Sequence, residues 1–212
     1  MEKGMQTTSI AYVDLLDWRR SVAEMYAAVR AADDPERAWA EWRERRDALF
    51  GDHPQSPLSD AAKADFVGLD YFDYDPSLRL EVELVALPEG RTEKLYVGDD
   101  GTVSLLPFAR TRGLRSRLGG ELMLYWIGGY GGGVFLPFLD GTSGATTYPG
   151  GRYLLDTIKG ADLGIARRWP AILDFNFAYN PSCSYSERWV CPLSPVGNRL
   201  PEPVWAGEKS PL

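Results

Sequence analysis

Residues 78–86 read Leu-Arg-Leu-Glu-Val-Glu-Leu-Val-Ala, and this stretch decides the fold. Apolar residues occupy every second position from Leu78 to Ala86, and charged residues stand between them at Arg79, Glu81 and Glu83. Successive side chains of a strand point to opposite faces, so one face of this segment is apolar and the other is charged. The alternation therefore predicts a half-buried β-strand.

Similar short segments follow along the chain and predict a sheet. Further strands are expected at residues 66–74, 121–127, 134–138, 152–155 and 172–177, and residues 95–105 have the pattern of a β-hairpin turning at residues 98–101. Glycine-rich turns rather than helices separate these strands, which argues against a parallel doubly wound sheet. An antiparallel β-sandwich or a partly open β-barrel is therefore expected.

The first sixty residues have the helical period instead. Apolar residues at spacings of three and four line one face of residues 15–29, and a second stripe runs through residues 39–50. Asp34-Pro35-Glu36 is typical of a helix start, because Asp34 can cap, Pro35 suits the first turn and Glu36 complements the helix dipole. His53-Pro54 ends this helix. We predict a helical segment over residues 1–60 and a β-domain over residues 61–212, as one folding unit.

The chain from Pro181 onward is expected to wrap over the sheet. Six prolines interrupt it, which excludes regular helix or strand over most of its length. It nevertheless contains Tyr185, Trp189 and Trp205, which are residue types that disordered tails lack. The expected architecture is α+β, with N-terminal helices packed on an antiparallel β-sandwich or partly open β-barrel and an irregular C-terminal wrap.

Charge and apolar content limit the classes of partner. The formal net charge is −7, whereas a general nucleic-acid-binding protein needs a basic face. The sequence has no apolar run of the roughly 18 residues that span a bilayer, and no apolar stretch near Met1 that is typical of a secretory signal. We expect a cytoplasmic protein that binds neither nucleic acid nor membrane, with its two cysteines reduced.

A single histidine, His53, removes several kinds of catalytic site. Histidine-rich zinc sites and the two-histidine iron triad need more imidazoles than this chain has. A Ser–His–acid triad would have to use His53, which stands at a helix end rather than after the last strand, and the sequence has no G-x-S-x-G turn. The glycine run at residues 128–133 precedes a strand pattern rather than a helix, so it predicts a hairpin and not a phosphate loop. The sequence assigns no metal site and leaves the cofactor unknown.

Arg152 is the first candidate for binding a ligand. It stands in Thr-Thr-Tyr-Pro-Gly-Gly-Arg-Tyr, residues 146–153, where a strand is expected to begin. Arginine forms forked hydrogen bonds with carboxylates and phosphates, so Arg152, with Tyr148 nearby, could hold an anionic group. The alternative is an internal ion pair with Asp174, or a side chain packed along the sheet.

A second polar group follows the last expected strand. Asp174 and Asn176 are two residues apart, so in a strand they share a face while the flanking phenylalanines take the other. That face could line a cleft or the interior of a barrel. The alternative is a polar network that only stabilises the turn at Asn180-Pro181. The residues that the ligand hypothesis assigns to binding or proton exchange are Asp174, Asn176, Asn180, Tyr185 and Glu208.

Cys183 and Cys191 leave three alternatives open. Seven residues separate them, whereas structural zinc pairs are usually two to four residues apart. They are buried inert thiols, a disulfide or redox pair, or a site in which Cys183 is a catalytic thiolate. A disulfide here would stabilise the fold by roughly 2–3 kcal/mol. His53 is the candidate base for Cys183, although it can equally cap the end of its helix.

Several longer motifs carry a family resemblance. They are W-x-x-R-R-D at residues 42–47, H-P-Q-S-P-L at 53–58, F-V-G-L-D-Y-F-x-Y-D-P at 66–76, L-P-F-L-D-G-T-S-G-A-T-T-Y-P-G-G-R-Y-L at 136–154, D-F-N-F-A-Y-N-P-S-C-S-Y-S at 174–186, C-P-L-S-P-V-G-N-R-L-P at 191–201 and A-G-E-K at 206–209. Together they resemble the family called domain of unknown function 1684, over about residues 38–209.

The resemblance implies a shared signature and assigns no catalytic role. Its fixed polar positions in this chain are Asp140, Arg152, Asp174, Asn176, Asn180, Cys183, Tyr185, Cys191, Asn198 and Glu208. The helix before Asp33 lies outside the resemblance and is a candidate contact for a homodimer.

Three functions are compatible with these observations. The leading hypothesis is binding, and by extension conversion, of a small anionic organic molecule in an aromatic-lined pocket of the β-domain. In the second, the protein is non-catalytic and has a structural or interaction role, and its polar signature locks the C-terminal wrap onto the sheet. The third is a thiol-based redox or metal-binding protein.

Overall fold

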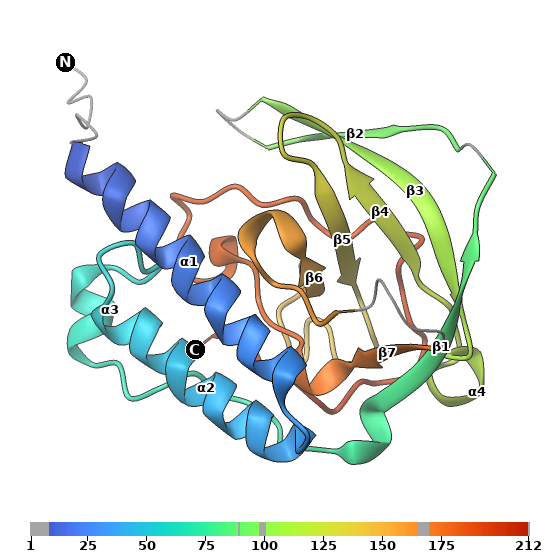
Figure 1. Ribbon diagram of the computed structural model, residues 1–212, viewed down its shortest axis with the longest axis horizontal. Helices are drawn as coiled ribbons and strands as arrows, with labels where there is room; N and C mark the ends of the chain where they lie inside the picture. Colours follow the sequence, from blue (N-terminus) through green and yellow to red (C-terminus); the bar gives the residue numbers. More distant parts are fainter. Residues whose placement is uncertain (1–8, 89, 98–100, 165–169, 212) are drawn as a thin grey trace.

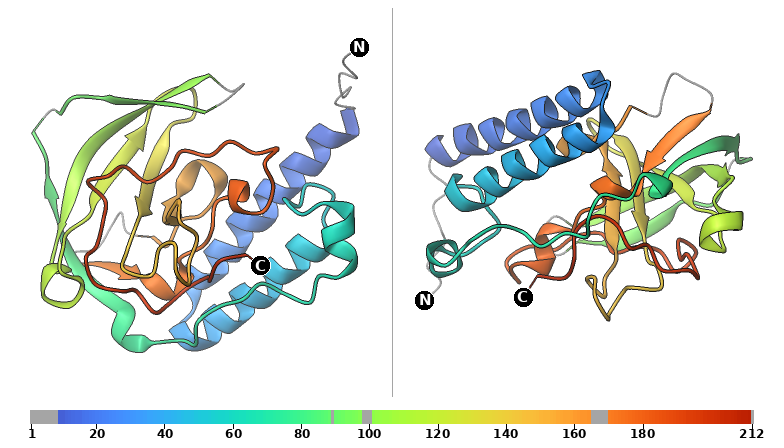
Figure 2. Two further views of the ribbon diagram at one scale, coloured as in Figure 1. Left: turned by 180° about the vertical axis from the view of Figure 1, so that it is seen from behind. Right: turned by 90° about the horizontal axis from the view of Figure 1, so that it is seen from below.

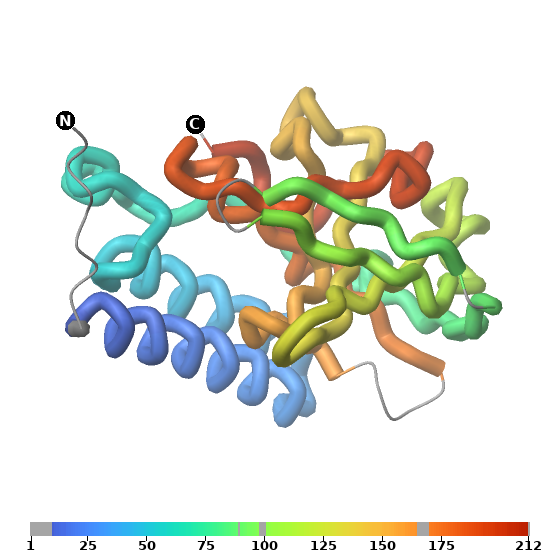
Figure 3. Tube along the Cα trace, turned by 90° about the horizontal axis from the view of Figure 1, so that it is seen from above, coloured from blue at the N-terminus to red at the C-terminus, as the bar shows by residue number. Residues whose placement is uncertain are grey.

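Two long helices pack beside a curled sheet in the computed structural model, which describes residues 9–88, 90–97, 101–164 and 170–211 (Figure 1). Helix α1 spans Ser9–Ala31 and α2 spans Pro35–Asp52, and a short helix, α3, spans Asp60–Ala64. Figure 3 shows α1 and α2 lying side by side on one side of the molecule, with the sheet on the other. Among the described residues, no helix is long and apolar enough to cross a membrane.

The start of α2 forms as its sequence predicts. The Asp34 carboxylate accepts a hydrogen bond from the Arg37 amide at 3.1 Å, and Pro35 occupies the first turn. Helix α1 buries Met25 and Tyr26 against α2, while its first turns expose Ile10, Tyr12, Val13 and Leu16. The predicted homodimer contact through this helix stays a prediction.

Within the described residues, seven strands form one antiparallel sheet that curls into a half-barrel. They are β1 (Arg79–Ala86), β2 (Glu93–Tyr96), β3 (Thr102–Arg112), β4 (Met123–Ile127), β5 (Gly133–Phe138), β6 (Arg152–Asp156) and β7 (Ala171–Asp174). The strand order is β6-β5-β4-β3-β1-β7, and β2 pairs with β3. The predicted α+β class and the partly open barrel are thus confirmed. The turn expected at residues 98–101 lies mostly outside the described residues.

Two strand predictions were wrong in part. Residues 66–74 are irregular, with one β-bridge between Tyr71 and Glu208. Strand β7 ends at Asp174, and residues 175–177 form a 3₁₀ turn because the Asp174 side chain accepts a hydrogen bond from the Asn176 amide. The side chains of Asp174 and Asn176 therefore do not share one strand face, and Asn176 is fully buried together with its two phenylalanine neighbours.

The sheet is buried on both faces where β4, β5 and β6 pair. Leu124 and Leu136 face one apolar cluster, which includes Leu173 and Val204. The next residue along β4, Tyr125, faces the other cluster, whose members also include Phe135, Tyr153, Trp189 and Cys191. The interior in which an aromatic-lined pocket was expected is therefore filled by the side chains themselves and by the C-terminal segment.

The C-terminal wrap is present and runs as an irregular segment over the sheet (Figure 2). Polar side chains attach it to the strands. Asn198 accepts a hydrogen bond from the Met123 amide at 2.9 Å, and its Nδ2 donates to the Met123 and Pro137 carbonyl oxygens. A parallel bridge joins Leu139 to Arg199, and the wrap ends with Glu208 paired to Tyr71. These contacts hold an irregular segment in one path without regular secondary structure.

Candidate ligand-binding cleft

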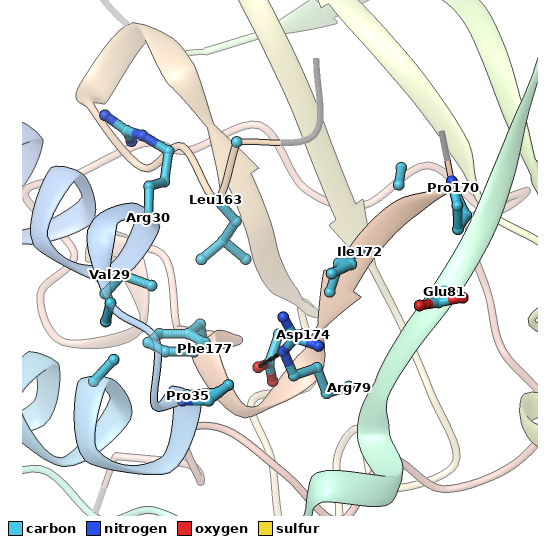
Figure 4. Close-up of a pocket in the computed structure, with 14 residues that line it drawn as sticks. Val29, Arg30, Pro35, Arg79, Glu81, Leu163, Pro170, Ile172, Asp174 and Phe177 are labelled. Atoms are coloured by element: carbon cyan, nitrogen blue, oxygen red, sulfur yellow. Dashed lines mark ion pairs between the residues drawn. The ribbon is translucent and has the colours of Figure 1, made fainter. Parts of the chain in front are cut away.

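A cleft of about 580 Å³ lies between the helices and the outer face of the β1–β7 pair. Figure 4 shows Arg30 on α1, Arg79 and Glu81 on β1, and Asp174 on β7, all around one space. The volume falls in the range of sites that hold small organic molecules. Its other walls are apolar and include Val29, Pro35, Leu163, Ile172 and Phe177.

Two of the charged residues that alternate in residues 78–86, Arg79 and Glu81, line the floor of this cleft. Strands β1 and β7 pair with Arg79 opposite Asp174 and Glu81 opposite Ile172. Residues two apart share a face, so these four side chains lie on the outer face of the pair. The intervening residues, Leu80 and Leu173 among them, pack into the core. One alternation therefore supplies both the core face and the cleft face.

Asp174 is the buried carboxyl group of the cleft. Its Oδ1 accepts hydrogen bonds from the Asn176 amide at 3.1 Å and from Asn176 Nδ2 at 2.8 Å, and its Oδ2 lies 3.6 Å from Arg79 Nε. Burial raises the pKa of this carboxyl above its usual value, although Asn176 and Arg79 oppose the rise. A carboxyl in this state can hold or give up a proton closer to neutral pH than an exposed one.

Two arginines place positive charge at the cleft. Arg79 is anchored only through Nε, and its side chain is 36% exposed, compared with 7% for that of Asp174. Arg30, at the end of α1, donates from Nη1 to the Asp162 carbonyl oxygen and lies 3.7 Å from Oδ2 of the same residue. Among the described residues that line the cleft, Phe177 is the one aromatic side chain.

Arg152 lies elsewhere and contacts only protein acceptors. It is fully buried, and its Nη2 donates to Asp140 Oδ2 at 2.9 Å and to the Val204 carbonyl oxygen at 3.0 Å. Its Nη1 donates to the carbonyl oxygens of Ala206 and Glu208. The ion pair is with Asp140 and not with Asp174, because the loop before β6 folds back over the strand. The guanidinium is thus used to hold the last turn of the wrap, and burial lowers its pKa despite Asp140.

Glu208 and Asn180 belong to a second buried network. Glu208 Oε2 accepts from Arg46 Nη2 and from the Asn180 amide, each at 2.9 Å, and burial raises the pKa of Glu208 although both partners oppose it. Sequence reasoning did not single out Arg46. The signal was available, because Arg46 is four residues after Trp42 and four before Phe50, on the apolar stripe of α2.

The remaining predicted residues are dispersed. Asn176 brackets Asp75, accepting from its amide at 2.8 Å and donating to its carbonyl oxygen at 2.9 Å. Tyr185 packs edge-on against Phe50, with ring centroids 5.0 Å apart. His53 caps α2, accepts from the Gln55 amide through Nδ1, and lies 3.5 Å from Asp17. Its contacts are with α1 and its own loop, so the structure does not pair it with Cys183.

The two cysteines and Tyr148 form a third group inside the wrap. The Tyr148 hydroxyl lies 3.9 Å from Cys183 Sγ, and Cys191 is buried beside them. In the described parts of the chain, no three His, Cys, Asp or Glu side chains gather so that they could hold a metal ion. The candidate site residues therefore fall into separate groups, and Asp174 is the one that lines the large cleft.

Comparisons with known proteins identify the family. The model of the family described as "Protein of unknown function (DUF1684)" matches residues 64–209, so the match begins at the last residue of α3 rather than at residue 38. A solution NMR structure of a protein from the gene locus rrnAC0354 of Haloarcula marismortui is 34% identical with a TM-score of 0.56, over 79% of this chain and 89% of that one. A comparison with curated proteins gave no match. The chain therefore belongs to the family of proteins of unknown function DUF1684.

Proposed function

We propose that this protein binds a small organic molecule through an anionic group, in the cleft between the helices and the β1–β7 pair. The observation that carries the proposal is the set of contacts that the Arg79 guanidinium makes. Its Nε faces Asp174, and among the described residues no protein acceptor takes up its two terminal nitrogens. Those nitrogens form the fork that recognises a carboxylate or phosphate.

The walls of the cleft suit the rest of such a ligand. Val29, Leu163, Ile172 and Phe177 offer an apolar surface for an organic body next to the charged floor. Arg30 brings a second guanidinium to the cleft, where the two arginines offset the acidic side chains of Glu81 and Asp174, so that an anion can approach Arg79. The expected ligand is thus a compact molecule with one carboxylate or phosphate group and an apolar part.

Asp174 would orient or exchange a proton with the bound molecule. Because burial raises its pKa, this carboxyl takes up a proton more readily than an exposed one, and in the protonated form it can donate to a ligand oxygen. If the protein is an enzyme, this is the group that we assign to acid–base work. Arg152, Asn176 and Glu208, in contrast, use their polar atoms within the fold.

The test is a thermal-shift screen with small carboxylates and phosphate monoesters. A compound present at about 100 times its Kd stabilises the folded state by roughly 2.7 kcal/mol, so a true ligand raises the Tm clearly. Arg79→Gln should weaken binding about tenfold to a hundredfold, because a hydrogen bond to a charged group contributes about 1.5–3 kcal/mol.

The matched control is Arg112→Gln. Arg112 also lies in the sheet and also pairs with an acid on β1, at 2.8 Å from Glu83, yet it does not line the cleft. Binding should be the same in this variant as in the wild type. Equal Tm shifts in wild type, Arg79→Gln and Arg112→Gln would show that the ligand binds elsewhere.

A further inference from the structure

The two cysteines pack in one cluster within the C-terminal wrap, and neither lines the cleft. Both are free thiols, and they are close enough for each to shift the pKa of the other. The Tyr148 hydroxyl lies 3.9 Å from Cys183 Sγ. Two neighbouring thiols with a hydroxyl beside them have the composition of a reactive site rather than of two unrelated core residues.

We propose that Cys183 and Cys191 form a dithiol site that hydrogen peroxide oxidises to an intrachain disulfide. This activity is independent of ligand binding in the cleft.

We assign Cys191 as the more acidic thiol of the pair. The neighbouring Cys183 side chain lowers its pKa, and Lys159 and the backbone of Ser182 and Cys183 act in the same direction, although burial opposes them. The same proximity raises the pKa of Cys183, which keeps its proton. Burial raises the pKa of Tyr148 to about 12, so at neutral pH its hydroxyl is a donor that can position the pair or the oxidant.

The limited exposure of the two cysteine side chains allows only a small oxidant to reach them. Cys191 is only 8% exposed, whereas Cys183 is partly exposed on the 3₁₀ turn Ser182–Ser184. A buried thiolate beside a partly exposed partner excludes large protein disulfides but admits hydrogen peroxide. The apolar surroundings, which include Tyr153 and Trp189, keep other thiols away from the intermediate.

The chemistry balances in two steps. The Cys191 thiolate attacks one oxygen of the peroxide, a sulfur–oxygen bond forms, the oxygen–oxygen bond breaks, and hydroxide leaves and is protonated to water. Cys183 then loses its proton and attacks the Cys191 sulfur, the sulfur–sulfur bond forms, and the sulfenic hydroxyl leaves as a second water. The two sulfurs lose two electrons, which the peroxide gains. An external dithiol reverses the change.

The first experiment uses the wild-type protein, purified with reductant and then treated with about one equivalent of hydrogen peroxide. We expect both thiols to disappear together and the intact mass to fall by two hydrogen atoms. Peptide mapping should find the bond between Cys183 and Cys191 within one chain, and dithiothreitol should restore both thiols. Two thiols that stay reduced while folded and react only in denaturant would show that they are inert core residues.

Single variants assign the roles. In Cys183→Ser, dimedone should trap a sulfenic acid on Cys191. In Cys191→Ser, oxidation of Cys183 should be more than about tenfold slower, because only a few per cent of an ordinary thiol is ionised at neutral pH. Glu187→Gln, an exposed change in the same loop, should react like the wild type. The proposal would be overturned if Cys191→Ser were oxidised at the wild-type rate, or if the disulfide joined two chains. The peptide mapping of the wild-type protein tests the proposal even if a variant fails to fold.

Discussion

At the scale of single residues, Asp174 combines a structural role with the chemical role that we propose for it. One carboxylate oxygen closes the 3₁₀ turn at residues 175–177, and the other faces Arg79 across the strand pair. Its position at the end of β7 brings a buried carboxyl to the edge of the cleft. Because the two roles use different oxygens, this one side chain can stabilise the local fold and contact a bound molecule at the same time.

The raised pKa of Asp174 gives a pH-dependent prediction. The folded form holds the proton more tightly than the unfolded form, so the contribution of this group to stability is greatest at low pH. It is lost as the pH rises from the ordinary pKa of 3.8 toward the raised folded pKa. Asp174→Asn removes this loss, because the amide oxygen can still accept from Asn176. We expect the Tm of the variant to exceed that of the wild type at about pH 7, with a smaller difference at about pH 4.

Thermal melts of both proteins at the two pH values check this. If Asp174→Asn is less stable than the wild type by the same amount at both pH values, then the ion pair with Arg79 outweighs the cost of burying the charge.

The sequence singles out Asp174 but does not predict its surroundings. The spacing of Asp174 and Asn176 predicts a shared strand face, yet the partner of Asn176 is Asp75, about a hundred residues away along the chain. A side chain that forms hydrogen bonds with the backbone of a distant residue leaves no pattern in its own stretch of sequence. The same limit applies to Arg152, whose acceptors come from the loop before β6 and from the end of the wrap.

At the scale of elements, the alternation at residues 78–86 was sufficient to define β1 and both of its faces. Alternation is a property of the strand itself, so it needs no knowledge of the neighbours. Helix α2 was predicted with equal success from its cap and its apolar stripe. Arg46 was missed because its position on that stripe signals only that it is buried, and its role becomes clear when its partner, Glu208, is known.

Arg152 attaches the end of the wrap to β6, and this gives a second prediction. Arg152→Ala removes the cation from Asp140 and leaves three backbone carbonyl oxygens without their donor. Breaking a buried ion pair by removing one partner typically costs about 3–5 kcal/mol, so we expect the free energy of unfolding to fall by that amount.

Guanidinium denaturation measures the change, with Arg112→Ala as the control. The Arg112 side chain is 66% exposed, and a surface pair of this kind contributes at most about 1 kcal/mol. If the two variants lose the same small amount, Arg152 is not the residue that holds the end of the chain.

At the scale of the whole molecule, the cleft exists only because distant parts of the chain meet. Arg30 comes from α1, Arg79 from β1 and Asp174 from β7, and α1 lies outside the region that matches the family. The sequence predicted the helices, the curled sheet and the wrap, because each has its own pattern. It left open whether the pocket is a cleft or the interior of a barrel, and side chains such as Phe135 and Tyr153 fill that interior.

We therefore propose that a ligand binds in the helix–sheet cleft rather than in the interior of the half-barrel. The central claim of this proposal is that Arg79 holds the anionic group of that ligand. The most direct measurement is native mass spectrometry of freshly purified wild type, Arg79→Gln and Arg112→Gln, each compared with its denatured mass. The account predicts an added small-molecule mass on wild type and Arg112→Gln that is lost or strongly reduced on Arg79→Gln. A bound mass that persists undiminished on Arg79→Gln, or three chains that all carry nothing, would contradict it.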